Sequence, residues 1–326
     1  MKRQGSFSRR KHWGLLDQWL RFDIPLSRYS GRRSCHAEER LPVINELLRR
    51  LDRRMMNSEP RPELTGVRRF AMEFWYFGVK EARACLFVGL FFAAVFTMPR
   101  AGLFGIPRYD ALLLIALAIQ AWMVIAKLET LDELKAISLF HLIGLGLEIF
   151  KTSGSIRSWS YPDEGWFKVF GVPLFSGFMY AGVGSYLIQA WRLLDLRIRH
   201  HPPYWMATIV ALMIYANFFT HHYIPDYRWH IAALAMGLYA RTVVIFRPLD
   251  RERRMPLLLS FVLTGFFVWL AENISTFFSV WQYPHQVGAW AVVHVGKWTS
   301  WSLLVIMTFT IVAQLKHIKK TIYVPD

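Results

Sequence analysis

The feature that most limits the fold of this sequence is a series of eight apolar runs. Each run has roughly 16–22 residues, and about 20 helical residues cross the roughly 30 Å hydrocarbon core of a bilayer. The runs lie at 80–98, 109–127, 134–150, 171–191, 204–221, 229–246, 256–277 and 298–315. They predict an all-α fold, that of a polytopic helical membrane protein with about eight transmembrane helices.

Composition excludes the main alternatives to a membrane protein. The 326 residues are 54% hydrophobic and 19% charged, whereas a soluble domain has about 25% charged residues. The mean hydropathy of +0.25 also argues against a disordered chain. Cys35 and Cys85 are the two cysteines, too few for a disulfide framework and without the spacing of a zinc site.

The net charge of +16 comes largely from the first part of the chain, because residues 1–69 hold 17 of the 39 Lys and Arg. Such a segment could bind nucleic acid, but in a membrane protein it more often lies against anionic headgroups. We therefore expect a cytoplasmic tail at 1–69, with no signal peptide and no nucleic-acid partner. Apolar residues at helical spacing between Leu41 and Leu51 predict an amphipathic surface helix within it.

Charge also predicts the orientation of the spans. With the basic tail inside, the inner segments carry 29 Lys and Arg and the outer connections carry 7. The positive-inside rule then places both termini in the cytoplasm, which requires an even number of spans.

Two short motifs occur twice along the chain. The segment Ile106-Pro-Arg-Tyr-Asp110 corresponds to Ile224-Pro-Asp-Tyr-Arg228, and Trp159-Ser-Tyr-Pro162 corresponds to Trp281-Gln-Tyr-Pro284. The offsets are nearly constant, at 118 and 122 residues. A fixed offset indicates an internal duplication.

A glutamate precedes each Trp-x-Tyr-Pro motif: Glu148 in one half and Glu272 in the other, 124 residues apart. We therefore predict two four-helix repeats at 70–200 and 201–326. Because four spans is an even number, both repeats insert the same way round and form a parallel repeat. All these motifs then map to the outer face.

The segment from His141 to Tyr180 resembles a known family. It contains Glu148-Ile-Phe-Lys-Thr-Ser-Gly154, Trp159-Ser-Tyr-Pro162 and Gly171-Val-Pro-Leu-Phe175. With the second Trp-x-Tyr-Pro motif, it resembles the YoaT-like bacterial integral-membrane family, domain of unknown function 817. The resemblance covers roughly residues 65–320 and implies a multi-pass protein of the bacterial plasma membrane, without implying a reaction.

A weaker similarity is to the membrane carotenoid hydratases. It rests on the order of a Glu, a Thr-x-Gly, an aromatic-x-Tyr pair and a Gly-Val-Pro-Leu segment: Glu148, Thr152, Gly154, Trp159, Tyr161 and Gly171–Leu174. The sequence departs from those enzymes at Ile156-Arg-Ser-Trp159, where they have a Phe-Gly-x-Tyr type segment. This similarity implies acid–base chemistry on a carbon–carbon double bond.

Glu148 and Glu272 are the candidate catalytic residues. A carboxyl group near the bilayer surface normally faces a polar cavity, and desolvation favours its protonated form, which suits a general acid. The alternative is a structural role, with hydrogen bonds from the following loop or pairing with Lys151, Arg157 or Arg228.

The candidate substrate-binding residues surround these carboxyl groups. Trp and Tyr are also common as interfacial belt residues, and a histidine within an apolar helix is more often a packed core residue than a proton relay. The candidates are Trp159, Tyr161, Trp281, Tyr283, His141 and Asp226.

Several histidines fall on the predicted outer loops: His221, His222, His230, His285 and His294. Imidazole with Asp226 would suit zinc or iron, but Pro225 interrupts helical spacing and no metalloprotease or desaturase histidine motif is present. We predict no metal. We also expect no cofactor, because the sequence lacks nucleotide-binding and nucleophile-elbow motifs.

These observations leave two functional hypotheses from different classes. The first is acid–base, hydratase-like chemistry on a lipid or isoprenoid at the outer face, with membrane lipids as partners. The second is a small-solute or cation transporter or binding protein, a class in which duplicated bundles are common. A structural protein whose basic tail recruits a partner is a third, simpler alternative.

Overall fold

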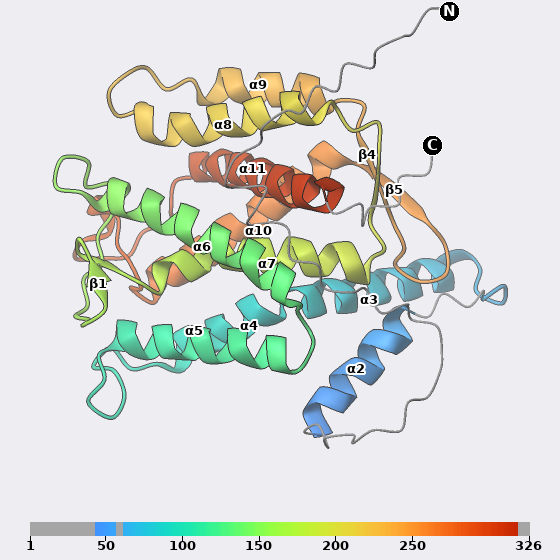
Figure 1. The fold of residues 1–326 in the computed structure, drawn as a ribbon, viewed down its shortest axis with the longest axis horizontal. Helices are drawn as coiled ribbons and strands as arrows, with labels where there is room; N and C mark the ends of the chain where they lie inside the picture. The colour runs from blue at the N-terminus through green and yellow to red at the C-terminus, as the bar shows by residue number, and fades with distance from the viewer. Residues whose placement is uncertain (1–42, 57–60, 319–326) are drawn as a thin grey trace, which may run out of the picture. The chain divides into compact units, whose positions relative to one another are not determined.

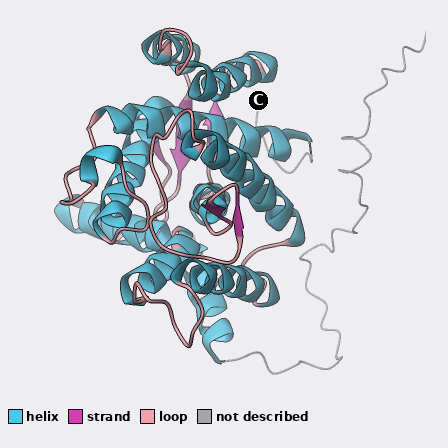
Figure 2. Cartoon of the chain, turned by 90° about the vertical axis from the view of Figure 1, so that its left-hand side faces the viewer, coloured by secondary structure: helices cyan, strands magenta, loops and turns pink. Residues whose placement is uncertain are grey.

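The computed structural model describes residues 43–56 and 61–318, and these residues are mainly helical (Figure 1). The strands are short beside the helices (Figure 2). The helices are α2 Val43–Met56, α3 Gly66–Ala84, α4 Leu86–Thr97, α5 Arg108–Ile125, α6 Leu131–Thr152, α7 Ser176–Leu193, α8 Tyr204–Thr220, α9 Arg228–Tyr239, α10 Leu257–Phe277 and α11 Gly296–Ile318. The strands are β1 Lys168–Val169, β2 Val172–Pro173, β3 Arg197–Arg199, β4 Val243–Phe246 and β5 Arg253–Pro256, with a 3-10 turn at Pro284–Gln286.

Each of the eight apolar runs overlaps a helix, but the helices differ in length. Among the described residues, three are long and apolar enough to cross a membrane: Arg108–Ile125, Leu257–Phe277 and Gly296–Leu315. Leu86–Thr97 and Tyr204–Thr220 are apolar but shorter. The fold is therefore largely helical, with three helices suited to a membrane.

The prediction of an all-α protein missed two small antiparallel sheets. The run 229–246 was predicted as one helix, yet α9 ends at Tyr239 and Val243–Phe246 is strand β4. Its Val-Val-Ile-Phe sequence is β-branched and aromatic, and a short apolar run of this kind fits a buried strand as well as a helix. The run 171–191 likewise begins with strand β2 before α7 starts at Ser176.

The larger sheet joins two connections that the sequence presents as ordinary charged loops. Strand β4 lies between β3 and β5, with Ile198 opposite Val244 and Val244 opposite Met255. Ion pairs link this region to α3, including one of 2.8 Å between Arg69 and Asp250. Figure 1 shows β4 and β5 at the opposite end of the helices from β1.

The amphipathic helix expected in the basic tail is present as α2. Leu47 and Leu51 on it are exposed, which suits a helix that lies on a membrane surface. The rest of the predicted tail, up to residue 42, lies outside the described residues.

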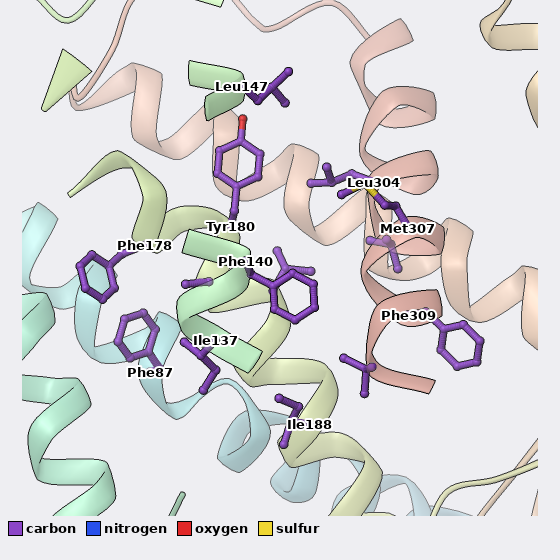
Figure 3. Packing of buried hydrophobic residues seen from close by; sticks show 14 of the residues in the cluster. Phe87, Ile137, Phe140, Leu147, Phe178, Tyr180, Ile188, Leu304, Met307 and Phe309 are labelled. Atoms are coloured by element: carbon purple, nitrogen blue, oxygen red, sulfur yellow. The ribbon is translucent and has the colours of Figure 1, made fainter. Parts of the chain in front are cut away.

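The helices pack as pairs. Helix α6 packs along α7 and α10 packs along α11, while α4 with α5 and α8 with α9 form two further pairs (Figure 1). The approach of α6 to α7 depends on Gly144, because a Cβ there would lie 2.4 Å from the ring of Tyr180. Figure 3 shows Phe87 facing Phe178, and Leu304 with Met307 on α11, in the apolar core between these helices.

Candidate functional site

The two Trp-x-Tyr-Pro segments lie side by side although 122 residues separate them. The Ser160 backbone N–H donates to the Gln282 carbonyl at 2.9 Å, and the Gln282 N–H donates back to the Ser160 carbonyl at 2.9 Å. This antiparallel bridge brings the loop after α6 against the loop after α10. The two predicted aromatic motifs therefore belong to one site.

Glu148 lies near the end of α6 and is almost fully buried. Its Oε2 accepts hydrogen bonds from the Trp159 indole Nε1 and the Tyr161 hydroxyl, both at 2.7 Å. Its Oε1 accepts one from the Tyr180 hydroxyl at 2.8 Å. Three donors to one carboxyl group suit its ionised form, since a carboxylate only accepts hydrogen bonds.

Glu272 lies near the end of α10 and has a similar environment. Its Oε1 accepts a hydrogen bond from the Tyr283 hydroxyl, and its Oε2 accepts one from the Trp301 indole Nε1 at 2.6 Å. Each predicted catalytic glutamate is thus bound by a tyrosine of the loop that follows it and by an aromatic residue of the next helix.

Lys297 lies between the two halves of this cluster. Its Nζ is 5.2 Å from the centroid of the Trp159 ring and 4.8 Å from that of Tyr283, within the range of cation–π attraction. The rings belong to different Trp-x-Tyr-Pro segments, so one lysine contacts both. A cation here also compensates the two neighbouring carboxylates.

The loop tyrosines act as hydrogen-bond donors. Burial, followed by the charge of Glu148, raises the pKa of Tyr161 well above its usual value. Burial and the charge of Glu272 do the same to the pKa of Tyr283. Both phenols therefore stay protonated and keep donating to the carboxylates.

Neighbouring elements hold the loops in place. On α5, the Tyr109 hydroxyl donates to the Val280 carbonyl at 2.9 Å, and Arg108 donates to the Phe278 carbonyl at 3.0 Å. The repeated motif at 106–110 thus connects the first half of the chain to the loop after α10. Figure 3 shows the Tyr180 ring of α7 with its hydroxyl directed toward Leu147, next to Glu148 in sequence.

The cluster opens onto a cavity of about 680 Å³. Glu148, Glu272 and Lys297 line it together with many apolar side chains of α4, α7 and α10, such as Phe91 and Phe261. Val244 and Phe246 of β4 also line it. The cavity therefore extends from the glutamate cluster past the helices to the sheet.

Some of the predicted binding residues line the cavity and others do not. Trp159, Trp281 and Tyr283 line the cavity, and Tyr161 contacts Glu148 beside it. His141 is not among the lining residues; its ring packs on that of Phe178, with the centroids 4.6 Å apart.

Asp226 lies at the edge of the site and holds Arg228, which lines the cavity. Their ion pair is 2.9 Å long. Burial acts to raise the pKa of Asp226, but the hydrogen bond from Asn217 and the neighbouring Arg228 outweigh it, and the pKa is lowered. Its contact with the site is therefore indirect.

Two of the loop histidines contact a lysine rather than a carboxylate cluster. The Lys151 Nζ lies 3.2 Å from His221 Nε2 and 2.8 Å from His222 Nε2. In the part of the chain that the structure describes, no group of three or more His, Cys, Asp and Glu side chains is placed to hold a metal ion.

Comparison with known proteins identifies the family. Residues 73–309 match the family described as "Protein of unknown function (DUF817)". The chain belongs to the DUF817 family. It is also 51% identical over 245 residues to the "Uncharacterized protein YoaT" of Bacillus subtilis (strain 168), which covers 75% of this chain and 92% of that protein.

The comparisons confirm the resemblance to the YoaT-like family. They give no support to the weaker similarity to carotenoid hydratases. No solved structure matches this DUF817 chain.

Sequence reasoning missed four residues of the cluster around Glu148 and Glu272: Lys297, Lys151, Tyr180 and Trp301. The first two entered only as loop charges that indicate topology or possible pairing. Tyr180 and Trp301 are 121 residues apart, close to the offsets of 122 and 124 in the motifs, so extending the self-comparison into the next helix would have found them. No spacing rule pointed to Lys297, because it stands in no repeated motif and one of its two ring partners, Trp159, is distant in sequence.

Proposed function

We propose that this DUF817 protein is a multi-pass membrane protein that binds a lipid or isoprenoid molecule in the cavity and performs acid–base chemistry on it at Glu148 and Glu272. The observation that carries the proposal is the meeting of both carboxylates and Lys297 in a largely apolar cavity. Ligand pockets have volumes of about 300–1,000 Å³ and combine apolar walls with a few polar groups.

We further propose eight crossings of the bacterial plasma membrane, with both termini in the cytoplasm. The three long apolar helices support this arrangement, as does the distribution of Lys and Arg. The predicted outer motifs gather in one cluster, while the predicted inner connections form the sheet at the other end of the helices. The shorter helices would cross together with the ordered segments that follow them.

The internal repeat is also part of the proposal, and the packing supports it. The pair α6 and α7 carries Glu148 and Tyr180, and the pair α10 and α11 carries Glu272 and Trp301. Helix α7 packs against α4 as α11 packs against α8. Corresponding elements therefore make corresponding contacts.

The geometry indicates which proton each group handles. As carboxylates, Glu148 and Glu272 are each suited to accept a proton or to stabilise positive charge on a substrate. Lys297 carries a proton that it can give. The rings of Trp159 and Tyr283 add electron-rich faces that stabilise a cationic intermediate. This division differs from the sequence hypothesis, in which a glutamate was the acid.

The test is comparative lipid mass spectrometry of host cells that carry wild type, a deletion or the Glu148→Gln/Glu272→Gln double variant. We expect one lipid or isoprenoid species to accumulate in the deletion and in the double variant, and its product to be present only with wild type. Glu164→Gln is the matched control, because Glu164 is an exposed carboxylate of the loop that also carries Tyr161. This control should retain the product.

Identical lipid profiles, with all variants inserted in the membrane, would overturn the enzymatic proposal. Solute flux in proteoliposomes that the double variant abolishes would then favour the transporter hypothesis.

A further inference from the structure

Lys151 is a buried lysine whose pKa is lowered to about 7, first by burial and then by the charges of Lys297 and Arg228. Its side chain lines the same cavity as Glu148, and the residue is 5% exposed. Its Nζ contacts two imidazole nitrogens, and among the described residues no carboxylate forms an ion pair with it. Burying a charge without a counter-charge is costly, so an anion bound beside Lys151 would favour its protonated form.

Hydrogen bonding fixes the role of His221. Its Nδ1 lies 2.7 Å from the Asn217 carbonyl oxygen, which can only accept, so Nδ1 carries the hydrogen. Its Nε2 then has a lone pair for the Lys151 ammonium group. Burial lowers the pKa of His221, which keeps the ring in this neutral form.

His222 has the same role as His221, and the centroids of the two rings lie 4.1 Å apart. Desolvation and the charge of Lys151 lower the pKa of His222 to about 4, so its ring is neutral near neutral pH. The two histidines therefore accept two hydrogen bonds from Lys151. An ammonium group has three N–H donors, and the third remains for a ligand.

The other cations of the cavity have carboxylate neighbours. Arg228 pairs with Asp226 at 2.9 Å, and Lys297 lies in the field of Glu272 and Glu148. Lys151 also lies in the field of Asp226 and Glu148, but among the described residues its Nζ hydrogen-bonds to two imidazoles and to no carboxylate. Arg228 lines the same cavity and offers further N–H donors.

We propose that the molecule bound in the cavity is an amphiphile with a phosphate headgroup, and that Lys151, held by His221 and His222, binds this phosphate. The inference rests on the proposed function, because it assigns the headgroup of the same ligand. Lysine binds phosphate as a point charge, and the apolar walls hold the hydrocarbon chain.

The experiment measures binding to the full-length protein in detergent by its tryptophan fluorescence, since Trp159, Trp281 and Trp301 line the cavity. The probes are farnesyl phosphate, farnesol and inorganic phosphate. Farnesyl phosphate adds a charge-assisted hydrogen bond to Lys151 that farnesol cannot make in the same way, so it should bind about tenfold or more tightly than farnesol.

The variant Lys151→Gln should remove this preference while farnesol binding remains. The matched control is Lys135→Gln, at the other end of α6, where Lys135 is exposed and pairs with Asp132 at 3.2 Å. It should bind all three probes as wild type does.

Equal binding of farnesol and farnesyl phosphate to wild type would overturn the phosphate site and leave the lipid cavity intact. Failure of both isoprenoids would overturn the proposed function as well. Inorganic phosphate that binds as tightly as farnesyl phosphate would show a site for free phosphate and overturn the assignment to a lipid headgroup. The wild-type comparison decides these outcomes even where Lys151→Gln does not fold.

Discussion

Glu148 and Glu272 have similar hydrogen-bond donors around them, but the charged side chains near them differ. Each carboxylate takes a hydrogen bond from the tyrosine of its Trp-x-Tyr-Pro segment. Glu148 also takes bonds from Trp159 and Tyr180, whereas Glu272 takes one further bond, from Trp301. The first site therefore has three donors and the second has two.

The two sites differ again three residues further along their helices. Lys151 follows Glu148, and Ser275 stands at the corresponding place after Glu272; both line the cavity. Lys297, in contrast, comes from the second half and contacts a ring from each half. The comparison teaches that both halves hold a carboxylate in place, while the cations make the cavity asymmetric.

The largest expected effect is a difference in stability between variants that lack one or the other carboxylate, because the two accept different numbers of hydrogen bonds. Glu148→Ala leaves three buried or half-buried donors without an acceptor, and Glu272→Ala leaves two. Each unsatisfied donor costs about 1–3 kcal/mol, so Glu148→Ala should destabilise the protein more, by about that amount. Thermal unfolding in detergent measures the difference, with Glu164→Ala as an exposed control.

Equal losses in the two variants would show that the third donor at Glu148 contributes nothing to stability. The comparison between the two sites would then be wrong.

A second prediction concerns the glycines that allow the helix pairs to approach. Gly144→Ala would place a Cβ 2.4 Å from the Tyr180 ring, and Gly265→Ala would place one 2.8 Å from the Ser302 Cα. Overpacking of this kind costs about 1–3 kcal/mol. Gly146→Ala is the control, because its Cβ would meet only the Tyr215 hydroxyl, at 3.9 Å.

Unfolding temperatures of the three variants test this. If the Gly146→Ala variant were as unstable as the other two, close packing could not explain the losses. A general effect of replacing glycine in these helices would then be the cause.

The smallest expected effect is the pH dependence at Lys151, which has no counterpart beside Glu272. The pKa of His222 is lowered to about 4, while an unfolded histidine titrates near about 6.5. The unfolded chain therefore binds more protons between these values, and stability should fall as the pH falls through this range. Protonated His222 can no longer accept from Lys151 and repels it.

Unfolding temperatures from about pH 6.5 down to about pH 5 test this, because this range lies below the pKa of about 7 to which Lys151 is lowered. His222→Gln should flatten the dependence. An unchanged slope in that variant would exclude His222 as its source.

Some features of the fold and site follow from local patterns. The apolar runs predicted a helix in each case, and the repeated Trp-x-Tyr-Pro motifs with their glutamates predicted residues that do meet in space. Strand β4 was missed because only Ala240, Arg241 and Thr242 separate α9 from the apolar Val243–Phe246, and the two were predicted as one run. His141 was predicted as a binding residue, but its ring packs on that of Phe178 and it does not line the cavity.

The sequence by itself determined the helical character, the basic tail and the pairing of motifs, because apolar periodicity, charge and repetition can all be read directly from the order of residues. Only the tertiary structure decided which cation serves both motifs and that Lys151 is held by two histidines. Those contacts join residues about 70 to 140 positions apart, and no local pattern encodes a distance of that kind. They exist because the packed helices bring these ends of the chain together.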